Sequence, residues 1–413
     1  MRILWVKAGK LLPVDTGGKI RSYNLLRQLS AQHELVLLSY YGGQPDAAYD
    51  KEIRDRLPNA EPLHTALPDA SVWQYAPRTL SPAPYAVTKF TSSRVTEAVA
   101  QRLSDRRFDI AVCDFLSASL NFPAVSTCPS VLFQHNVESV LWRRQAAHER
   151  NPAKRLAFAF EAAKMARYER AAVRRFAHVI AVSDRDREVM STMVDPSHIS
   201  VVPTGVDVQQ YRIAAGARAA HPLVVFLGSM DWEANADAVD YFCRGIWPAV
   251  RTAVPSARFR IVGRNPGAHV RALASDSVEV TGTVTSVVDH LKEAAVFAVP
   301  LRIGGGTRLK IFEAMAAGRA VVSTSIGAEG LDVVNGSDIV LADSARNFAD
   351  AIIRLLQDET RRQQIGTAAA DTAARHDWPA VAQAFTAVLG RVARTVALKA
   401  AVASVGEAHA ATP

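Results

Sequence analysis

The chain has 413 residues, of which 49% are hydrophobic and 21% are charged, and its formal net charge is +8. This length favours two domains, each able to bury its own core, and the composition excludes a disordered or fibrous protein. The three cysteines, Cys113, Cys128 and Cys243, fit no metal spacing and are predicted to be reduced core residues. The sequence contains no uninterrupted apolar run of the ~18 residues that span a bilayer, and residues 1–10 read as a first strand rather than a signal peptide. We therefore expect a cytoplasmic protein.

Short β-branched runs alternate with helical patterns along the chain. Predicted strands cover 2–6, 34–40, 110–113, 130–134, 178–183 and 199–203, and a second series covers 222–228, 258–263, 278–282, 296–300, 320–324 and 338–342. Continuous apolar runs separated by helices predict parallel sheets that are covered on both faces. The predicted fold class is α/β, with two Rossmann-like doubly wound parallel-sheet domains facing a cleft, where such sheets bind ligands.

The domain boundaries are predicted where this pattern changes. Residues 1–206 form the predicted N-terminal domain, the polar, Ala/Gly-rich stretch 207–221 a linker, and 222–375 the C-terminal domain. A helix over 376–395 is expected to pack back on the N-terminal domain, and 396–413 is predicted to be a weakly patterned tail.

Most of the excess positive charge lies in one helical segment, residues 142–176, which holds ten basic and three acidic side chains. Its cations alternate with Leu, Phe and Met. One interpretation is a long solvated helix with a basic face, and the other is docking on anionic lipid headgroups. No nucleic-acid recognition motif or aromatic stacking platform accompanies the charge, which argues against a nucleic-acid partner.

The stretch "GGGTRLKIFEAMAAG" (304–318) carries the most specific chemistry. A glycine loop that opens a helix offers unpaired N–H groups and the positive end of the helix dipole, which suit phosphate. Arg308 and Lys310 lie at that end, where cations cost about 0.3–1 kcal/mol unless an anion arrives. Glu313 lies further along the helix and can accept hydrogen bonds from sugar hydroxyls. These features predict a nucleoside diphosphate site, and the alternative is a plain βα turn with solvated charges.

Part of this stretch resembles a known family. "FEAMAAGRAVVST" (312–324) is similar to the "EAMAxGxPVV" signature of family-4-type glycosyltransferases, which have the GT-B fold. Further segments resemble the family in the same order, and the C-terminal one resembles a bacterial exopolysaccharide-type subset; these segments are 16–39, 133–139, 181–188, 201–207 and 226–239.

The resemblance implies transfer of a sugar from a nucleotide-diphosphate donor to a hydroxyl of a glycan or lipid-linked acceptor. The donor would bind mainly to the C-terminal domain, and the acceptor would enter from the N-terminal domain. Residues carried over as donor-binding are Glu313, Gly304, Gly305, Gly306, Thr307, Gly228 and Gly18. Gly17 and Arg21 are assigned to the diphosphate or acceptor side, and His135, Arg308 and Lys310 are the predicted catalytic residues.

Two departures from the family pattern affect the donor site. Gly305 stands where family members carry a first glutamate, and 228–235 lacks the cation that usually follows the first strand of the C-terminal domain. Arg308 and Lys310 would replace that cation, and backbone N–H groups of 304–307 would bind the donor sugar. The transferred sugar and the nucleotide base stay open.

The expected chemistry needs neither a metal nor another cofactor, because the sequence contains no His/Cys ligand cluster. Family analogy favours retention of configuration. An inverting transfer would need a base, for which His135, Asp114 and Glu138 are candidates. Two other functions remain at this point, a catalytically silent sugar-nucleotide-binding subunit and a sugar-nucleotide epimerase.

Overall fold

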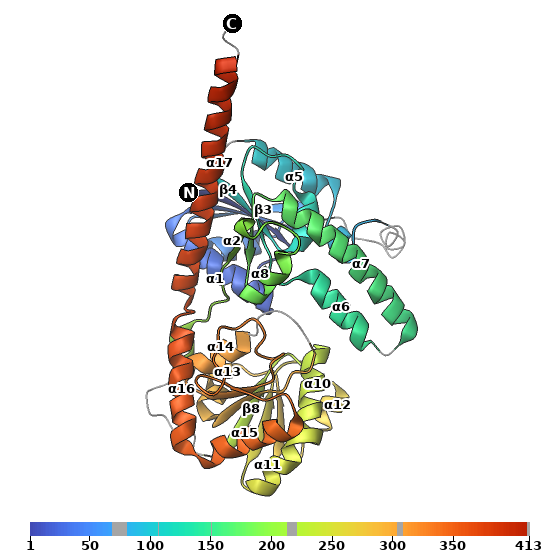
Figure 1. Ribbon diagram of the computed structural model, residues 1–413, viewed down its shortest axis with the longest axis vertical. Coiled ribbons are helices and arrows are strands. Elements are labelled where there is room, and N and C mark those ends of the chain that lie inside the picture. The colour runs from blue at the N-terminus through green and yellow to red at the C-terminus, as the bar shows by residue number, and fades with distance from the viewer. Residues whose placement is uncertain (68–80, 106, 150, 213–220, 304–308, 411–413) are drawn as a thin grey trace. The chain divides into compact units, whose positions relative to one another are not determined.

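A computed structural model describes residues 1–67, 81–105, 107–149, 151–212, 221–303 and 309–410, with side chains up to residue 398. The chain divides into two compact units (Figure 1). The N-terminal unit consists of Met1–Pro203 and Trp378–Pro413, and the C-terminal unit of Thr204–Asp377. The predicted boundaries at 206 and 375 lie a few residues from this division.

The N-terminal unit is built on a seven-stranded parallel sheet with the order β3-β2-β1-β4-β5-β6-β7. The strands are β1 (Arg2–Ala8), β2 (Glu34–Tyr41), β3 (Ala60–Ala66), β4 (Ile110–Asp114), β5 (Ser130–Phe133), β6 (His178–Ala181) and β7 (Ile199–Val201). The order reverses between β1 and β4, and ligands of doubly wound sheets bind beyond the carboxyl ends of the strands at this point.

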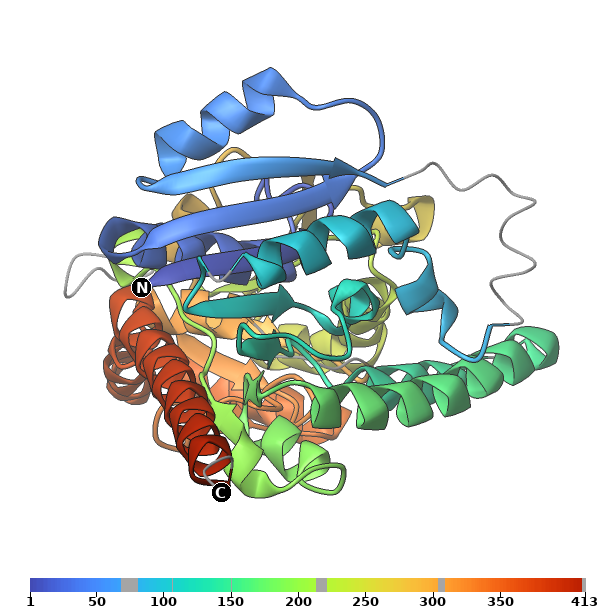
Figure 2. The ribbon, with the colours of Figure 1, turned by 90° about the horizontal axis from the view of Figure 1, so that it is seen from above.

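Helices connect these strands. They are α1 (Gly17–Gln32), α2 (Ala47–Arg56), α4 (Tyr85–Thr88), α5 (Ser93–Ser104), α6 (Glu138–His148), α7 (Pro152–Arg175) and α8 (Asp184–Met190), with 3₁₀ turns η1 (Leu116–Asn121) and η2 (Pro196–His198). Figures 1 and 2 show α6 and α7 as an antiparallel hairpin that projects from the sheet. The basic segment 142–176 therefore forms most of this hairpin, rather than one continuous helix.

The C-terminal unit contains a six-stranded parallel sheet with the order β10-β9-β8-β11-β12-β13. Its strands are β8 (Leu223–Leu227), β9 (Arg258–Val262), β10 (Val278–Gly282), β11 (Val296–Val299), β12 (Ala320–Ser323) and β13 (Val340–Leu341). The helices are α9 (Val208–Tyr211), α10 (Glu233–Tyr241), the π-helical turn η3 (Phe242–Ile246), α11 (Trp247–Ala253), α12 (Ala268–Arg271), α13 (Val287–Glu293), α14 (Leu309–Ala316), α15 (Ala345–Gln357) and α16 (Glu359–Ala374).

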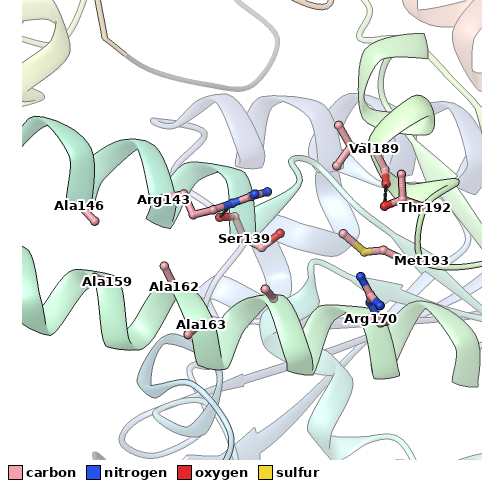
Figure 3. A pocket seen from close by; sticks show the side chains of 11 residues that line it. Ser139, Arg143, Ala146, Ala159, Ala162, Ala163, Arg170, Val189, Thr192 and Met193 are labelled. Atoms are coloured by element: carbon pink, nitrogen blue, oxygen red, sulfur yellow. Dashed lines mark hydrogen bonds between the residues drawn. The ribbon is translucent and has the colours of Figure 1, made fainter.

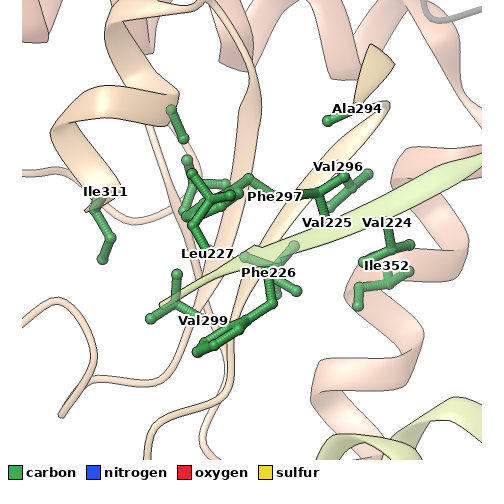
Figure 4. Packing of buried hydrophobic residues seen from close by; sticks show 14 of the residues in the cluster. Val224, Val225, Phe226, Leu227, Ala294, Val296, Phe297, Val299, Ile311 and Ile352 are labelled. Atoms are coloured by element: carbon green, nitrogen blue, oxygen red, sulfur yellow. The ribbon is translucent and has the colours of Figure 1, made fainter. Parts of the chain in front are cut away.

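Both faces of this second sheet are covered. Consecutive side chains of a strand point to opposite faces, and β8 and β11 are buried at every position. Figure 4 shows Ile311 of α14 and Ile352 of α15 packed around these central strands, and both side chains are fully buried. Each such apolar side chain contributes about 1.5–3 kcal/mol when it leaves water. The prediction of two α/β domains with parallel sheets is confirmed.

The structure corrects the sequence reading in three places. The sequence pattern does not predict strand β3, because Ala60–Ala66 contains Pro62 and lacks a β-branched run. Proline is tolerated in a strand at the edge of a sheet, which is where β3 lies. The predicted linker holds the short helix α9. The predicted tail is helical as far as Ala410, in keeping with its many alanines, since alanine has the highest helix propensity.

Helix α17 (Trp378–Ala410) returns the chain to the N-terminal unit. Phe385 packs with its ring centroid 5.7 Å from that of Trp5 and 5.1 Å from that of Phe133. In the described part of the chain, the stretch Trp378–Leu398 is long and apolar enough to cross a membrane by length and composition, although 33% of its most apolar window is buried. Its contacts with β1 and β5 make it a packing helix of this unit.

Candidate functional site

The N-terminal candidate site lies where the order of the first sheet reverses. Lys7 near the end of β1 and Asp114 at the end of β4 are paired in register on neighbouring strands. His135 follows the end of β5 by two residues. All three side chains are buried, at 4%, 0% and 2% exposure. The fold thus brings together a cation, a carboxylate and an imidazole that are far apart in the sequence.

Asp114 accepts hydrogen bonds on both oxygens. Its Oδ2 accepts from Ser22 Oγ at 2.7 Å, Lys7 Nζ at 3.0 Å and Trp5 Nε1 at 3.1 Å. Its Oδ1 lies 2.8 Å from His135 Nε2. Burial alone would raise the pKa of Asp114, but the Lys7 charge and the hydrogen bond with His135 hold that pKa below its usual value. The Asp114 carboxylate is therefore ionised, and both of its oxygens accept hydrogen bonds. It is an unsuitable general base, although the sequence offered it as a candidate for that role.

His135 is neutral in this arrangement. Burial penalises the imidazolium and lowers the pKa of His135 to about 3, against the opposing hydrogen bond with Asp114. A neutral ring with Nε2–H donating to the carboxylate carries a lone pair on Nδ1. This Nδ1 has no hydrogen-bond partner among the described residues. His135 Nδ1 is therefore a buried hydrogen-bond acceptor and cannot donate a hydrogen bond.

Phe115 covers the imidazole. Its ring stacks on His135 with centroids 3.6 Å apart and an interplanar angle of 18°. The backbone of Phe115 has φ 71°, an uncommon value for a residue with a side chain. A Cβ built on Gly18 would lie 2.4 Å from Phe115 Cζ, so Gly18 gives this ring its space. Gly17 and Gly18 form the first turn of α1 after the cap residue Thr16.

The C-terminal candidate site lies at the corresponding reversal, between β8 and β11. Gly228 follows β8, and Lys310 is the second residue of α14. Lys310 Nζ donates to Asn235 Oδ1 at 2.8 Å and lies 4.3 Å from the centre of the Phe226 ring. A Cβ on Gly228 would come within 2.7 Å of Asn235 Nδ2 and 2.9 Å of Lys310 Nζ. Gly228 therefore lets the ammonium group approach the end of the central strand.

A second cation at this edge was not found from the sequence. Arg264 follows β9 and donates from Nε to Ser229 Oγ at 2.7 Å, and Ser229 in turn lies 2.5 Å from Asp231 Oδ1. The family pattern places this cation within 228–235. The register of β8 with β9 brings Arg264 to that segment from the next strand, and only its position directly after a predicted strand could have indicated it.

Glu313 is half-buried on the next turn of α14, and its Oε1 accepts a hydrogen bond from the Tyr211 hydroxyl at 3.0 Å. Burial raises the pKa of Glu313, while the Tyr211 hydrogen bond and the Lys310 charge lower it. Tyr211 comes from α9, inside the stretch that was predicted to be a featureless linker. A sugar diol would have to use Oε2 or displace the tyrosine.

Models of known protein families match both halves of the chain. The family model described as "Glycosyltransferase Family 4" matches residues 16–210, and that described as "Glycosyl transferases group 1" matches residues 221–358. Together they cover most of the sequence. The chain belongs to the family-4-like GT-B glycosyltransferases.

Named relatives of this family match about half of the chain. The phosphatidyl-myo-inositol mannosyltransferase of Mycobacterium leprae is 30% identical over 224 residues, which are 52% of this chain and 59% of that protein. The GDP-mannose:cellobiosyl-diphosphopolyprenol alpha-mannosyltransferase of Xanthomonas campestris is 28% identical over 215 residues, which are 49% and 55% of the two chains. The matched region thus spans a little over half of each relative.

Solved structures share the fold over nearly the whole chain. Sucrose-phosphate synthase from Thermosynechococcus elongatus has a TM-score of 0.67 at 17% identity, over 95% of this chain and 99% of that one. Anabaena Alr3699/HepE, solved in complex with UDP, has a TM-score of 0.65 at 15% identity, over 95% and 100%. At this identity the likeness concerns the GT-B fold alone.

The structure places the predicted site residues of this glycosyltransferase in two groups. His135 and Gly18 meet around Phe115 in the N-terminal unit, and Gly228, Lys310 and Glu313 lie together in the C-terminal unit. Arg21 is also buried on α1, and burial lowers its pKa to about 10. Five predicted residues lie outside the described part of the chain, namely Gly304, Gly305, Gly306, Thr307 and Arg308.

Among the acidic side chains of the N-terminal unit, one sequence-based candidate remains, Glu138. Glu138 begins α6, and burial beside Glu169 raises its pKa to about 7, so it stays a candidate base. The spacing Asp184-Arg185-Asp186 lies in the first turn of α8, where Ser183 Oγ donates to Asp186 at 2.7 Å. Within the described ranges, no group of three or more His, Cys, Asp or Glu side chains could hold a metal ion.

Proposed function

We propose that this chain is a hexosyltransferase that moves a sugar from a nucleoside-diphosphate donor to a hydroxyl of a lipid-linked or glycan acceptor. The observation that carries the proposal is the edge of the C-terminal sheet. There the Glu313 carboxylate, an acceptor suited to a ribose diol, lies one helical turn from the Lys310 ammonium, which suits a diphosphate. Arg264 adds a second cation at the same edge.

The names of the relatives suggest which substrates to test first. Two of them are named mannosyltransferases, one acting with phosphatidyl-myo-inositol and one with GDP-mannose and a cellobiosyl-diphosphopolyprenol. Both names contain a lipid-linked acceptor. For this chain we propose a mannose or related hexose donor and an acceptor in cell-surface polysaccharide or glycolipid synthesis.

In the proposed reaction the bond between the sugar C1 and the donor phosphate oxygen breaks, and a bond from C1 to the acceptor oxygen forms. Negative charge develops on the leaving diphosphate. Lys310 and the N–H groups at the start of α14 supply fixed positive charge close to this developing negative charge. The main contribution of the protein to the reaction is therefore electrostatic stabilisation of the leaving group. The acceptor proton passes to the leaving phosphate oxygen.

The N-terminal unit supports retention of configuration in this proposal. Burial lowers the pKa of His135, and both oxygens of Asp114 already accept hydrogen bonds, so neither residue suits the strong base that inversion requires. Glu138 is then the one sequence-based candidate left for the base of an inverting transfer. We assign His135 the role of accepting a hydrogen bond on Nδ1 from a hydroxyl of the transferred sugar. This contact would orient the sugar without removing a proton from it.

We also propose that the enzyme works on the cytoplasmic face of a membrane. At the tip of the α6–α7 hairpin, Leu156 and Phe160 are exposed at 73% and 60% and are four residues apart on one face of α7. Lys154 and Arg155 are exposed beside them. Apolar side chains flanked by cations suit an anionic lipid surface.

A donor screen tests the activity. The purified chain is incubated with GDP-mannose, UDP-glucose, UDP-galactose and UDP-N-acetylglucosamine, and release of the nucleoside diphosphate is followed. Slow hydrolysis of one donor is the expected result. A converted sugar would instead identify an epimerase, and binding without turnover would identify a silent subunit.

A sedimentation assay tests the membrane proposal. Binding to vesicles of phosphatidylcholine with phosphatidylglycerol should be salt-sensitive, and neutralising Arg143, Arg144, Lys154 and Arg155 together should abolish most of it. Binding that is unchanged in this variant rules the hairpin out as the docking element.

A further inference from the structure

A cavity of about 490 Å³ lies between α6, α7 and α8 in the N-terminal unit. This volume is within the range of about 300–1,000 Å³ that small-molecule sites occupy. Its walls consist largely of the smallest apolar side chains, namely Ala146 of α6 and Ala159, Ala162, Ala163 and Ala166 of α7 (Figure 3). The cavity is therefore a channel between α6 and α7 that is partly open to solvent and has both apolar and polar walls.

Polar side chains line one end of this channel. Arg143 and Arg170 are exposed and line it from α6 and α7, as Figure 3 shows. Ser139 lines it at the start of α6; its side chain is fully buried, and its Oγ has no hydrogen-bond partner among the described residues. Ser139 follows His135 by four residues, and its backbone N–H donates to Glu169 of α7.

Three carboxylates of the hairpin have partners other than the two arginines that line the cavity. Glu169 accepts from the backbone N–H groups of Glu138 and Ser139 and from Gln134. Glu161 accepts from the backbone N–H of Tyr85 and from Lys164, and Glu149 accepts from the backbone N–H of Asn151. In the described part of the hairpin, none of these three acids is paired with Arg143 or Arg170.

We propose that this cavity binds the hydrocarbon chain and phosphate of a lipid-linked acceptor, an inference that rests on the proposed function and specifies its acceptor class. The phosphate lies between Arg143 and Arg170, and the chain runs along the alanines toward the hairpin tip. Arginine suits phosphate because its planar fork donates two parallel hydrogen bonds. The cavity lining includes no aromatic platform for a base and no carboxylate for a ribose, so it does not suit a nucleotide.

The direction of the channel agrees with this occupant. One end begins beside the segment that carries His135, and the other points toward the tip with Leu156 and Phe160. A lipid entering from a membrane at the tip would thus carry its phosphorylated head toward the reaction edge of the sheet.

The test titrates the full chain with decyl phosphate below its micelle concentration in a calorimeter. Inorganic phosphate and octyl glucoside serve as the charge-only and chain-only ligands. Decyl phosphate should bind at one site, at least about tenfold more tightly than either, because both parts of the cavity are used. Arg143→Ala and Arg170→Ala should each weaken this binding about tenfold or more. Ala163→Phe, which fills the cavity from an exposed position, should abolish it.

Arg167→Ala is the matched control, since Arg167 is exposed on the same helix but neither lines the cavity nor belongs to the proposed membrane-docking tip. Donor hydrolysis and far-UV circular dichroism are recorded for every variant. Decyl phosphate binding that is unaffected by all three cavity variants, or no tighter than binding of the two partial ligands, overturns the inference while hydrolysis leaves the proposed function standing. A chain that hydrolyses no donor contradicts the proposed function, and its cavity can still be titrated.

Discussion

The two units place polar residues at the same position in their sheets, but they hold them differently. In the N-terminal unit, Asp114 and His135 are buried and Asp114 has four side-chain partners. In the C-terminal unit, Lys310 and Glu313 are only partly buried, and they form hydrogen bonds with Asn235 and Tyr211, neutral side chains that a ligand can displace. The first arrangement favours a rigid group with a fixed protonation state, whereas the second leaves charge available for an incoming anion and diol.

The largest expected effect would break the N-terminal arrangement. Lys7→Met removes the cation beside Asp114 and leaves a buried carboxylate without its charge partner, which should lower the free energy of unfolding by about 3–5 kcal/mol. Urea unfolding followed by fluorescence measures this change. The double variant Lys7→Met/Asp114→Asn should recover most of the loss, and a double variant as unstable as the single one would show that the charge pair is not the cause.

In the C-terminal unit, the corresponding change should affect turnover rather than stability. Lys310→Met keeps the apolar stem over Phe226 but removes the charge, so kcat should fall about 10²–10³-fold with little change in nucleoside affinity. Arg308→Ala should act in the same direction. Lys292→Met, an exposed lysine on α13 paired with Asp289, is the control and should keep full activity. Unchanged kcat in both site variants contradicts the diphosphate assignment.

A smaller effect is expected for ribose recognition. Glu313→Gln should weaken binding of the donor's nucleoside diphosphate about 10–100-fold, because hydrogen bonds to a charged acceptor contribute about 1.5–3 kcal/mol. Tyr211→Phe, which removes only the neutral partner of Oε1, should change the affinity by no more than a few-fold. Calorimetry measures both, and equal losses would assign the ligand contact to the tyrosine.

The smallest effect tests the neutral state of His135. The unfolded chain binds a proton at this position below about pH 6.5, whereas burial keeps the folded histidine neutral down to a pKa of about 3. The free energy of unfolding should therefore decrease as the pH is lowered from about 6.5 to about 3. This group contributes at most about 1.4 kcal/mol per pH unit to that decrease. His135→Gln should show a shallower slope in urea unfolding from pH 7 to 5. Identical slopes would mean that His135 is charged in the folded protein.

The sequence by itself determined the fold class, because buried parallel strands are continuous apolar runs. Of the strands in the described part of the chain, twelve were predicted and the edge strand β3, which contains Pro62, was not. It also indicated Lys310 and Glu313 through the glycine-rich stretch 304–318, and the resemblance to the family implied His135. Tertiary structure decided which side chains these residues meet. Lys7 and Asp114 are joined by strand register, Arg264 reaches Ser229 from the neighbouring strand, and Tyr211 reaches Glu313 from a short helix in the presumed linker. Such contacts depend on chain pairing across about 35 to 107 positions, which no local spacing encodes, and they set burial and therefore protonation.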